Sequence, residues 1–270
     1  MDTSTLGEIT QRQQKMWATG DFHRIGVAQV VVGELLVRAL HVHAGERVLD
    51  VAAGSGNTAL AAARRGAEVI CSDYVPELLD IAQRRAEVEG LPLHTEVADA
   101  QQLPFADGTF DVVTSTFGAM FAPDQPRTAA ELLRVLRDEG RLGMANWTPY
   151  SWAGAQFGLM ARFMPPPPGL QPPSVWGTEE RLRELFGDRI SVLETRRQHA
   201  EICYSSTAAL FDLFRQWFGP ISTAWQALDG SQREQFRDGW IALAEQFNIA
   251  QDGTCEIHSE YLEVVAIKAG

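Results

Sequence analysis

The sequence has few cysteines, no long basic run and no long apolar run. Cys71, Cys203 and Cys255 are widely spaced, without a Cys-x-x-Cys pair or a cluster with histidine. We therefore expect neither a disulfide framework nor a metal site. No uninterrupted apolar segment is long enough to span a bilayer, and the first residues lack the basic start and apolar stretch of a secretion signal. We expect a cytoplasmic protein with no membrane partner.

Positive charge is also scarce, because 23 lysines and arginines stand against 35 acidic residues and the net charge is −12. This balance opposes tight binding to nucleic-acid phosphates or anionic lipid. The 270 residues are 45% hydrophobic and 21% charged, an ordinary composition for a chain with one sizeable core. We expect a single domain over residues 1–270 with a small-molecule substrate and no nucleic-acid partner.

The most informative segment is residues 47–57, which read RVLDVAAGSGN. Its apolar start is typical of a buried strand, and residues 52–56 have almost no side-chain bulk. An alanine-rich helix is predicted from Thr58 to Arg65. Such a turn lets the backbone approach a ligand closely, with free N–H groups at the start of the helix. The segment predicts a nucleotide-like cofactor.

The first half of the chain alternates between predicted strands and helices. This order favours a parallel sheet covered on both faces, hence an α/β protein. Further strands are expected at residues 67–73, 93–98, 110–116 and 141–147, and helices at residues 76–89 and 129–136.

The two ends of the chain follow other patterns. Helices are expected over residues 1–20 and 24–40, which we interpret together as an N-terminal helical flap, residues 1–40, before the cofactor core at residues 41–147. Residues 148–189 are rich in proline, glycine and aromatic residues, with one short helix near 178–186. A sixth strand is expected at 190–204, helices at 207–218 and 222–247, and a last strand at 261–267. We assign residues 148–250 to a substrate lid and residues 251–270 to the last strand of the sheet.

The glycine turn alone leaves two cofactors open. Residues 54–59 also satisfy the G-x-G-x-x-A form of a dinucleotide-binding turn, and Asp73 is spaced to bind an NAD ribose. Asp50 favours a different cofactor, because a carboxylate repels a pyrophosphate but attracts the cationic amino-acid end of S-adenosylmethionine (SAM). Asp99, after the third strand, can accept a hydrogen bond from an adenine amino group.

Motifs in the right order extend this interpretation. They are Asp50-x-Ala52-x-Gly54-x-Gly56, Asp99-Ala100, and the segments 103–113 and 131–142. Over residues 45–147 the chain resembles the class I SAM-dependent methyltransferases, especially the UbiE-like quinone C-methyltransferases. The resemblance implies a Rossmann-like, mostly parallel seven-stranded sheet with an antiparallel last strand, flanking helices and a helical lid. Ala52 departs from the family pattern, which has glycine there.

The resemblance also implies roles for particular residues. Asp50, Ala52 and Gly54 would line the methionine end of SAM, and Asp73 would bind the ribose hydroxyls. The adenine would lie near Tyr74, Asp99 and Ala100, while Thr116 and Phe117 would approach the SAM amino group and the methyl-transfer face. In the flap, Trp17 and Phe22 either close over the cofactor or join two helices as an aromatic staple.

The methyl acceptor is less well defined. His23, His199 and Tyr204 are candidate bases, although each is more typical of a surface or hydrogen-bonded structural residue than of a catalyst. Trp147, Trp152 and Phe157 follow the fifth strand and are candidates for an apolar acceptor pocket, against the alternative of an ordinary core. No metal site for catechol-type chemistry can be assembled from the acids after the fourth strand.

The sequence thus predicts a SAM-dependent methyltransferase that acts on a small hydrophobic or aromatic molecule, at carbon, oxygen or nitrogen. We expect a role in secondary metabolism, with S-adenosylhomocysteine (SAH) as product. One alternative keeps SAM bound while the lid pocket does non-methylating work, such as a pericyclic or decarboxylating step. An NAD-dependent oxidoreductase is a further alternative. The aromatic-rich cap also suits a homodimer interface.

Overall fold

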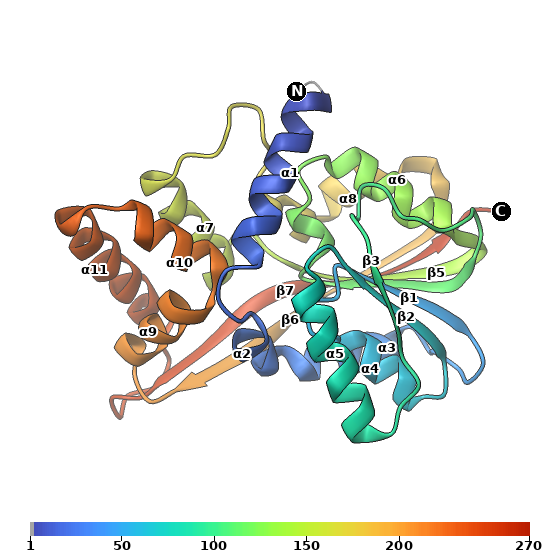
Figure 1. The fold of residues 1–270 in the computed structure, drawn as a ribbon, viewed down its shortest axis with the longest axis horizontal. Coiled ribbons are helices and arrows are strands. Elements are labelled where there is room, and N and C mark those ends of the chain that lie inside the picture. The colour runs from blue at the N-terminus through green and yellow to red at the C-terminus, as the bar shows by residue number, and fades with distance from the viewer. Residues whose placement is uncertain (1–2) are drawn as a thin grey trace.

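A seven-stranded sheet runs through the molecule, with helices on both faces and a helical cap at one end (Figure 1). The computed structural model describes residues 3–270. The strands are β1 Arg47–Val51, β2 Glu68–Asp73, β3 His94–Val97, β4 Phe110–Thr116, β5 Leu136–Trp147, β6 Ile190–Tyr204 and β7 Cys255–Lys268.

The strand order is β3-β2-β1-β4-β5-β7-β6. Neighbouring strands from β3 to β5 are parallel, and β7 is antiparallel to both β5 and β6. The predicted fold is confirmed, including the antiparallel last strand. In this order β1 and β4 are adjacent at the centre, so their carboxyl ends form one edge of the sheet.

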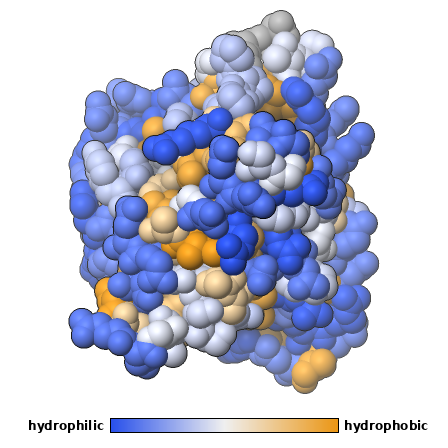
Figure 2. All heavy atoms as spheres, turned by 90° about the vertical axis from the view of Figure 1, so that its left-hand side faces the viewer, coloured by the Kyte–Doolittle hydropathy of each residue, from blue (hydrophilic) through white to orange (hydrophobic). Residues whose placement is uncertain are grey.

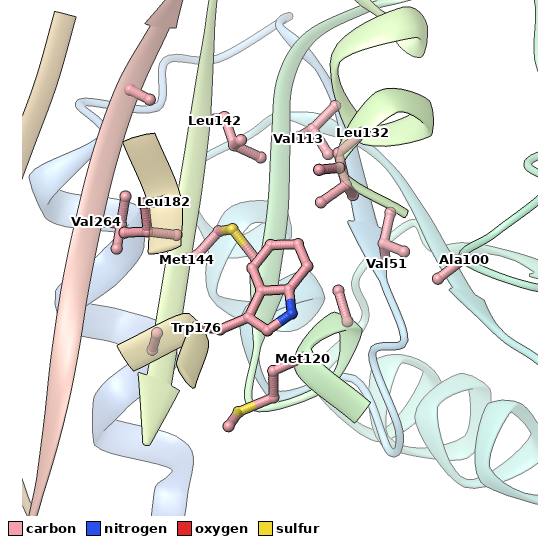
Figure 3. Close-up of a cluster of buried hydrophobic side chains, with 14 of the residues drawn as sticks. Val51, Ala100, Val113, Met120, Leu132, Leu142, Met144, Trp176, Leu182 and Val264 are labelled. Carbon is pink, nitrogen blue, oxygen red and sulfur yellow. The ribbon is translucent and has the colours of Figure 1, made fainter. Parts of the chain in front are cut away.

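Each face of the sheet is covered by its own set of helices. On one face, Val48 and Val112 pack with α3 Val30–Ala39, α4 Asn57–Arg64 and α5 Pro76–Glu89. On the other face, Leu49 and Val113 pack with α6 Gln125–Val135 and α8 Glu179–Phe186. Successive residues of a strand point to opposite faces, which is why β1 and β4 each supply both cores. Figure 3 shows buried Trp176 near Met120 and Met144 in the second core.

The cap consists of four helices that pack on the far ends of β6 and β7. They are α7 Trp152–Phe163, α9 Thr207–Trp217, α10 Gly219–Ala227 and α11 Gly230–Phe247. Their core is aromatic and includes the fully buried rings of Phe211, Phe236 and Trp240. Figure 2 shows apolar side chains among hydrophilic ones on the side of the molecule that carries the cap. The predicted homodimer stays a prediction.

The N-terminal segment joins the cap to the sheet. It contains α1 Thr3–Trp17, α2 His23–Gly26 and the short helix η1 Val27–Gln29 before α3. The other short helices are η2 Ala119–Phe121, η3 Pro173–Gly177 and η4 Gly187–Arg189. Of the predicted flap, residues 1–2 lie outside the described part. Within residues 3–270, no helix combines the length and the apolar character needed to cross a membrane.

Several predicted boundaries are wrong. The helix expected at residues 222–247 is two helices, because the Asp229 side chain accepts a hydrogen bond from Gln232 N and the Asp229 backbone N–H donates one to Gln232 Oε1, a capping box that starts α11. The lid expected over residues 148–250 is not continuous, since α8 covers the sheet and β6 belongs to it. The helix expected at 24–40 is divided by η1, and β7 starts at Cys255 rather than 261.

Candidate cofactor and acceptor site

A cavity lies at the carboxyl ends of β1, β2 and β4, around the glycine turn; we call it the turn cavity. All the residues predicted to bind the cofactor line it, although they come from six separate parts of the chain. They are Trp17, Phe22, Asp50, Ala52, Gly54, Asp73, Tyr74, Asp99, Ala100, Thr116 and Phe117. The sheet therefore brings the predicted cofactor residues together.

The turn itself depends on left-handed backbone at Ala52, Gly54 and Gly56, whose φ angles are 51°, 55° and 82°. Gly56 is also tightly packed, because a Cβ there would lie 2.9 Å from the Cβ of Ala82. Ala52 is not a glycine and adopts a conformation that costs an L-residue about 1–2 kcal/mol. Its methyl group lies against Gly118, where a Cβ would be 2.7 Å away. The small residue at 118 therefore makes room for the side chain at 52.

Asp73 ties the end of β2 to the glycine turn. Its Oδ2 accepts a hydrogen bond from Gly54 N at 2.8 Å, and its Oδ1 accepts one from Val75 N at 2.9 Å. Burial raises the pKa of Asp73 to about 6. A carboxylate offers about four acceptor positions, so two remain for ligand hydroxyls. The residue thus fits the ribose-binding role implied by its position.

Asp50 lines the turn cavity, but both oxygens of its carboxylate accept hydrogen bonds from within the protein. Oδ1 accepts from the Thr114 hydroxyl at 2.8 Å and Oδ2 from Ala59 N at 2.9 Å. Only 1% of the residue is exposed, and burial raises its pKa to about 7. Asp50 therefore joins β1, β4 and the first turn of α4 at the floor of the turn cavity. A negative charge here also favours a nearby cationic group on a ligand.

Asp99 is held by Gln101, which sequence analysis missed. Asp99 Oδ1 accepts from Gln101 N at 2.9 Å and from Gln101 Nε2 at 3.0 Å. The Gln101 amide also donates to Thr10 Oγ1 at 2.9 Å, and Gln14 Nε2 donates to the Tyr74 carbonyl at 2.6 Å. These bonds fasten α1 across the end of the cavity formed by Tyr74 and Asp99.

Trp17 and Phe22 form the aromatic staple, and their closure over a cofactor stays a prediction. Their rings contact edge to face at 5.5 Å, which joins the end of α1 to the start of α2 as a staple. Trp17 also contacts Phe121 at 5.0 Å and Phe218 at 5.5 Å. Both residues line the turn cavity and a second cavity beneath the cap. The flap therefore forms part of the wall of each.

The second cavity, which we call the cap cavity, includes the three residues predicted for an acceptor pocket: Trp147, Trp152 and Phe157. Apart from Gln29 and Gln156, every side chain that lines it is apolar or aromatic. The two cavities share Trp17, Phe22, Gln29, Phe117 and Phe121. The shared residues define a boundary across which two bound molecules would face each other.

The structure does not bring the candidate bases together. His199 and Tyr204 are exposed residues of β6 that line neither cavity. His23 is closer, because its Nδ1 lies 3.0 Å from the Ser55 hydroxyl, and Ser55 lines the turn cavity. Burial and the charge of Arg85 lower the pKa of His23, so the imidazole is mostly neutral at pH 7. His23 itself is absent from both linings.

Sequence analysis missed Gln29 and Gln156 as well as Gln101. Gln156 lies on α7, a helix that the proline-rich composition of residues 148–189 concealed. Gln29 ends a short 3-10 helix and gives no motif. Among residues 3–270, no three His, Cys, Asp or Glu side chains are grouped as a metal site would require.

Comparisons with known proteins agree with this geometry. Residues 49–144 match a family described as a methyltransferase domain. The chain is 42% identical over 265 residues to an uncharacterized protein of Mycobacterium tuberculosis, covering 96% of this chain and 95% of that protein. It is 45% identical over 121 residues to a demethylmenaquinone methyltransferase of Thermus thermophilus, covering 44% of this chain and 54% of that enzyme.

Solved structures agree on the fold. The crystal structure of the YcgJ protein from Bacillus subtilis has a TM-score of 0.61 and 19% identity, covering 88% of this chain and 98% of that one. Together with the cofactor motifs at the carboxyl ends of β1, β2 and β4, the family match and the Thermus relative identify residues 49–144 as a SAM-dependent methyltransferase domain.

Proposed function

We propose that the protein transfers the methyl group of SAM to a small apolar or aromatic molecule held in the cap cavity. One observation carries this proposal: the turn cavity and the cap cavity meet at a shared boundary that includes Phe117 and Gln29. A donor on one side and an acceptor on the other would be aligned for an in-line displacement, in which orientation supplies much of the rate.

The residues of the turn cavity suit SAM in chemical type. Asp73 keeps two acceptor positions for the ribose hydroxyls, and Asp99 supplies an acceptor near Tyr74 for the adenine amino group. Asp50 adds negative charge beneath the cationic end of the ligand. Bound SAM supplies a methyl group on a positively charged sulfur. The chain positions that group and excludes water around it with Trp17, Phe22 and Phe121.

The lining of the cap cavity supports a cyclic or aromatic acceptor. Trp147, Trp152 and Phe157 offer flat apolar surfaces for such a ring. The Thermus relative, by its name, methylates demethylmenaquinone, which is itself a ring compound. A role in secondary metabolism remains part of the proposal.

Calorimetry tests whether the protein binds the cofactor product SAH. SAH should bind to the folded protein in a one-to-one complex, and Asp73→Ala should weaken it because each lost hydrogen bond to a charged acceptor is worth about 1.5–3 kcal/mol. Incubation with SAM and a panel of aromatic acceptors should then release SAH. The absence of SAH binding by well-folded protein would contradict the proposal.

A second function is favoured by the neutral lining of the cap cavity. A pericyclic reaction needs shape and exclusion of water rather than an acid or base, which apolar and amide side chains supply. In that case SAM would remain bound and unreacted. The turnover assay separates the two functions, because a changed acceptor without release of SAH supports the second. Membership of the methyltransferase family removes the reason for an NAD-dependent oxidoreductase.

A further inference from the structure

Helix α7 contributes two side chains with hydrogen-bond donors to the lining of the cap cavity, which is apolar elsewhere except at Gln29. Trp152 and Gln156 are four residues apart, so they lie on the same face of the helix one turn from each other. Both line the cavity, and both are almost fully buried, with 2% and 5% of their surface exposed. A buried polar group normally has a hydrogen-bond partner, so a buried donor without one indicates a place where a ligand could bind.

The orientation of the Gln156 amide follows from its neighbour. Trp240 Nε1 lies 3.0 Å from Gln156 Oε1, and an indole N–H can only donate. The amide oxygen must therefore be the end that faces Trp240, which directs the NH₂ group elsewhere. Within the described part of the chain, no hydrogen bond engages that NH₂ group. It is available to a molecule in the cavity.

The indole N–H of Trp152 also lacks a hydrogen-bond partner in the described part of the chain. It is buried and makes no hydrogen bond to any residue between 3 and 270. A buried donor without a partner costs about 1–3 kcal/mol, a cost that a ligand oxygen would remove. Since the surrounding lining is apolar except at Gln29, these two donors would discriminate strongly between acceptor molecules.

We propose that the acceptor molecule carries an oxygen that accepts hydrogen bonds from the Gln156 amide and the Trp152 indole. This inference rests on the proposed function, in which the cap cavity holds the acceptor. The chemical class is an apolar or aromatic carbonyl compound, or the ionised oxygen of an enol or phenol. A protonated amine does not fit, because it has no lone pair for these donors and would face a positively charged sulfonium.

A pair of isosteric probes tests the inference without turnover. Acetophenone and α-methylstyrene have the same shape, but the ketone oxygen of the first is a methylene group in the second. Each is titrated into SAH-saturated protein while the indole ¹H–¹⁵N signals are recorded. Acetophenone should bind about fivefold more tightly, the equivalent of one hydrogen bond near 1 kcal/mol. It alone should shift the Trp152 signal downfield, which Trp152→Phe assigns by its loss.

Matched variants separate recognition from structure. Gln156→Leu removes the donor and should abolish most of the preference for the ketone. Trp240→Phe breaks the same side-chain hydrogen bond but keeps the Gln156 donor, so its preference should persist. If Gln156→Leu fails to fold, Trp152→Phe tests the second donor and should reduce the preference. Retained SAH affinity shows that each variant is folded.

Three results would overturn the inference: equal affinity of the wild type for both probes, no binding of either, or an unchanged preference in Gln156→Leu. None of them contradicts methyl transfer, which is judged separately by SAH binding and SAH release. Conversely, a ketone preference in a protein that releases no SAH from SAM would support the binding site and contradict the transfer reaction.

Discussion

Phe117 and Trp147 stack ring on ring, with centroids 3.7 Å apart and planes inclined by only 2°. Phe117 lines both cavities, whereas Trp147 lines the cap cavity alone. Tyr261 meets the Phe117 ring edge-on at 5.5 Å and braces it. The stack is therefore part of the partition between the cofactor and the acceptor, and its two members should respond differently to mutation.

Trp147→Leu should impair acceptor binding while SAH binding is retained. The substitution removes aromatic surface from the cap cavity only, so the SAH dissociation constant should stay within about twofold. Acetophenone should bind about two- to twelvefold more weakly, since contact between aromatic rings adds about 0.5–1.5 kcal/mol beyond burial. Both constants are measured by titration. Phe117→Leu is the matched variant and should weaken both ligands; equal effects of the two substitutions on SAH would contradict the partition.

SAH affinity should fall in mild acid. Only the ionised form of Asp73 offers all its lone pairs to ribose hydroxyls, and burial raises its pKa to about 6. Below that pH the affinity should decrease, approaching about tenfold per pH unit, because the amino and carboxyl groups of SAH do not titrate between pH 5 and 7. Protonation of Asp50, whose pKa is about 7, should add a shallower decrease in SAH affinity between about pH 8 and pH 6.

Asp73→Asn provides the control for this pH dependence. The variant should bind SAH more weakly at pH 8 than the wild type, and its affinity should change little between pH 6.5 and 5. Calorimetric titrations at several pH values supply the comparison. A wild-type affinity that is constant from pH 8 to pH 5 would show that the carboxylate does not accept from the ligand.

The free energy of unfolding of the ligand-free protein should have the opposite pH dependence. Burial raises the pKa of both Asp50 and Asp73 above the ordinary value of 3.8, so the folded state binds more protons than the unfolded state between about pH 4 and 7. The contribution of these two groups to stability is complete below the unfolded pKa and is lost as pH rises through the folded pKa.

Asp50→Asn isolates that contribution. The amide oxygen can accept from Ala59 N, and the amide NH₂ group can donate to the Thr114 hydroxyl, so both contacts survive. Between pH 5 and 7 the variant should lose less stability than the wild type in urea denaturation. A parallel pH dependence of the two proteins would indicate that Asp50 titrates normally.

The cofactor site was predictable because its residues follow strands directly. Asp50, Asp73 and Asp99 each lie at or just after the end of a parallel strand, and parallel strands deliver their carboxyl ends to one edge of the sheet. The local sequence pattern could not predict the hydrogen-bond partners of each carboxylate. Asp50 is separated from Thr114 by 64 positions, so nothing near Asp50 in the chain indicates that both its oxygens are engaged.

The cap was less predictable for a different reason. Helix α7 ends at Phe163, just before the prolines at 165–168, and those prolines suggested an irregular segment throughout. The helix and its Gln156 were therefore missed, although Trp152 and Phe157 were predicted to line a pocket. His199 and Tyr204 failed as candidate bases because the irregular alternation of residues 190–204 does not say which side chains point outward.

Gly118→Ala should strongly destabilise the protein and abolish SAH binding. The new Cβ would lie 2.7 Å from the Ala52 methyl group and closer still to the Ala52 carbonyl oxygen, which is backbone and has little room to move. We expect a loss of about 3 kcal/mol in urea denaturation, at the upper end for overpacking. Ala52→Gly alone should be within about 1 kcal/mol of wild type, because relief of a positive φ offsets added flexibility in the unfolded chain. The double variant should remain unstable, since the carbonyl contact persists; full rescue would contradict this account.

Asp229→Ala should weaken the start of α11. The substitution removes the side-chain acceptor of the capping box and should cost about 1 kcal/mol of unfolding free energy. Asp238→Ala on the same helix is the control, because within residues 3–270 this exposed carboxylate pairs only with Arg237 beside it and should change stability by less than about 0.5 kcal/mol. Urea denaturation compares the two. Equal losses of unfolding free energy would mean that the capping box at Asp229 does not set the boundary between α10 and α11.

Gln29→Leu should reduce methyl transfer more than cofactor binding. Gln29 is the polar member of the set shared by the two cavities, and its side chain makes no hydrogen bond within residues 3–270. An amide at this boundary can orient the reacting atom of the acceptor, so its loss should lower the rate of SAH release about tenfold, the equivalent of about 1.4 kcal/mol. The SAH dissociation constant should change by no more than about twofold. Gln13→Leu is the matched control, because Gln13 lines the turn cavity alone and should affect SAH affinity rather than the rate with saturating SAM. If both substitutions change only SAH affinity, Gln29 belongs to the cofactor site and does not act on the acceptor.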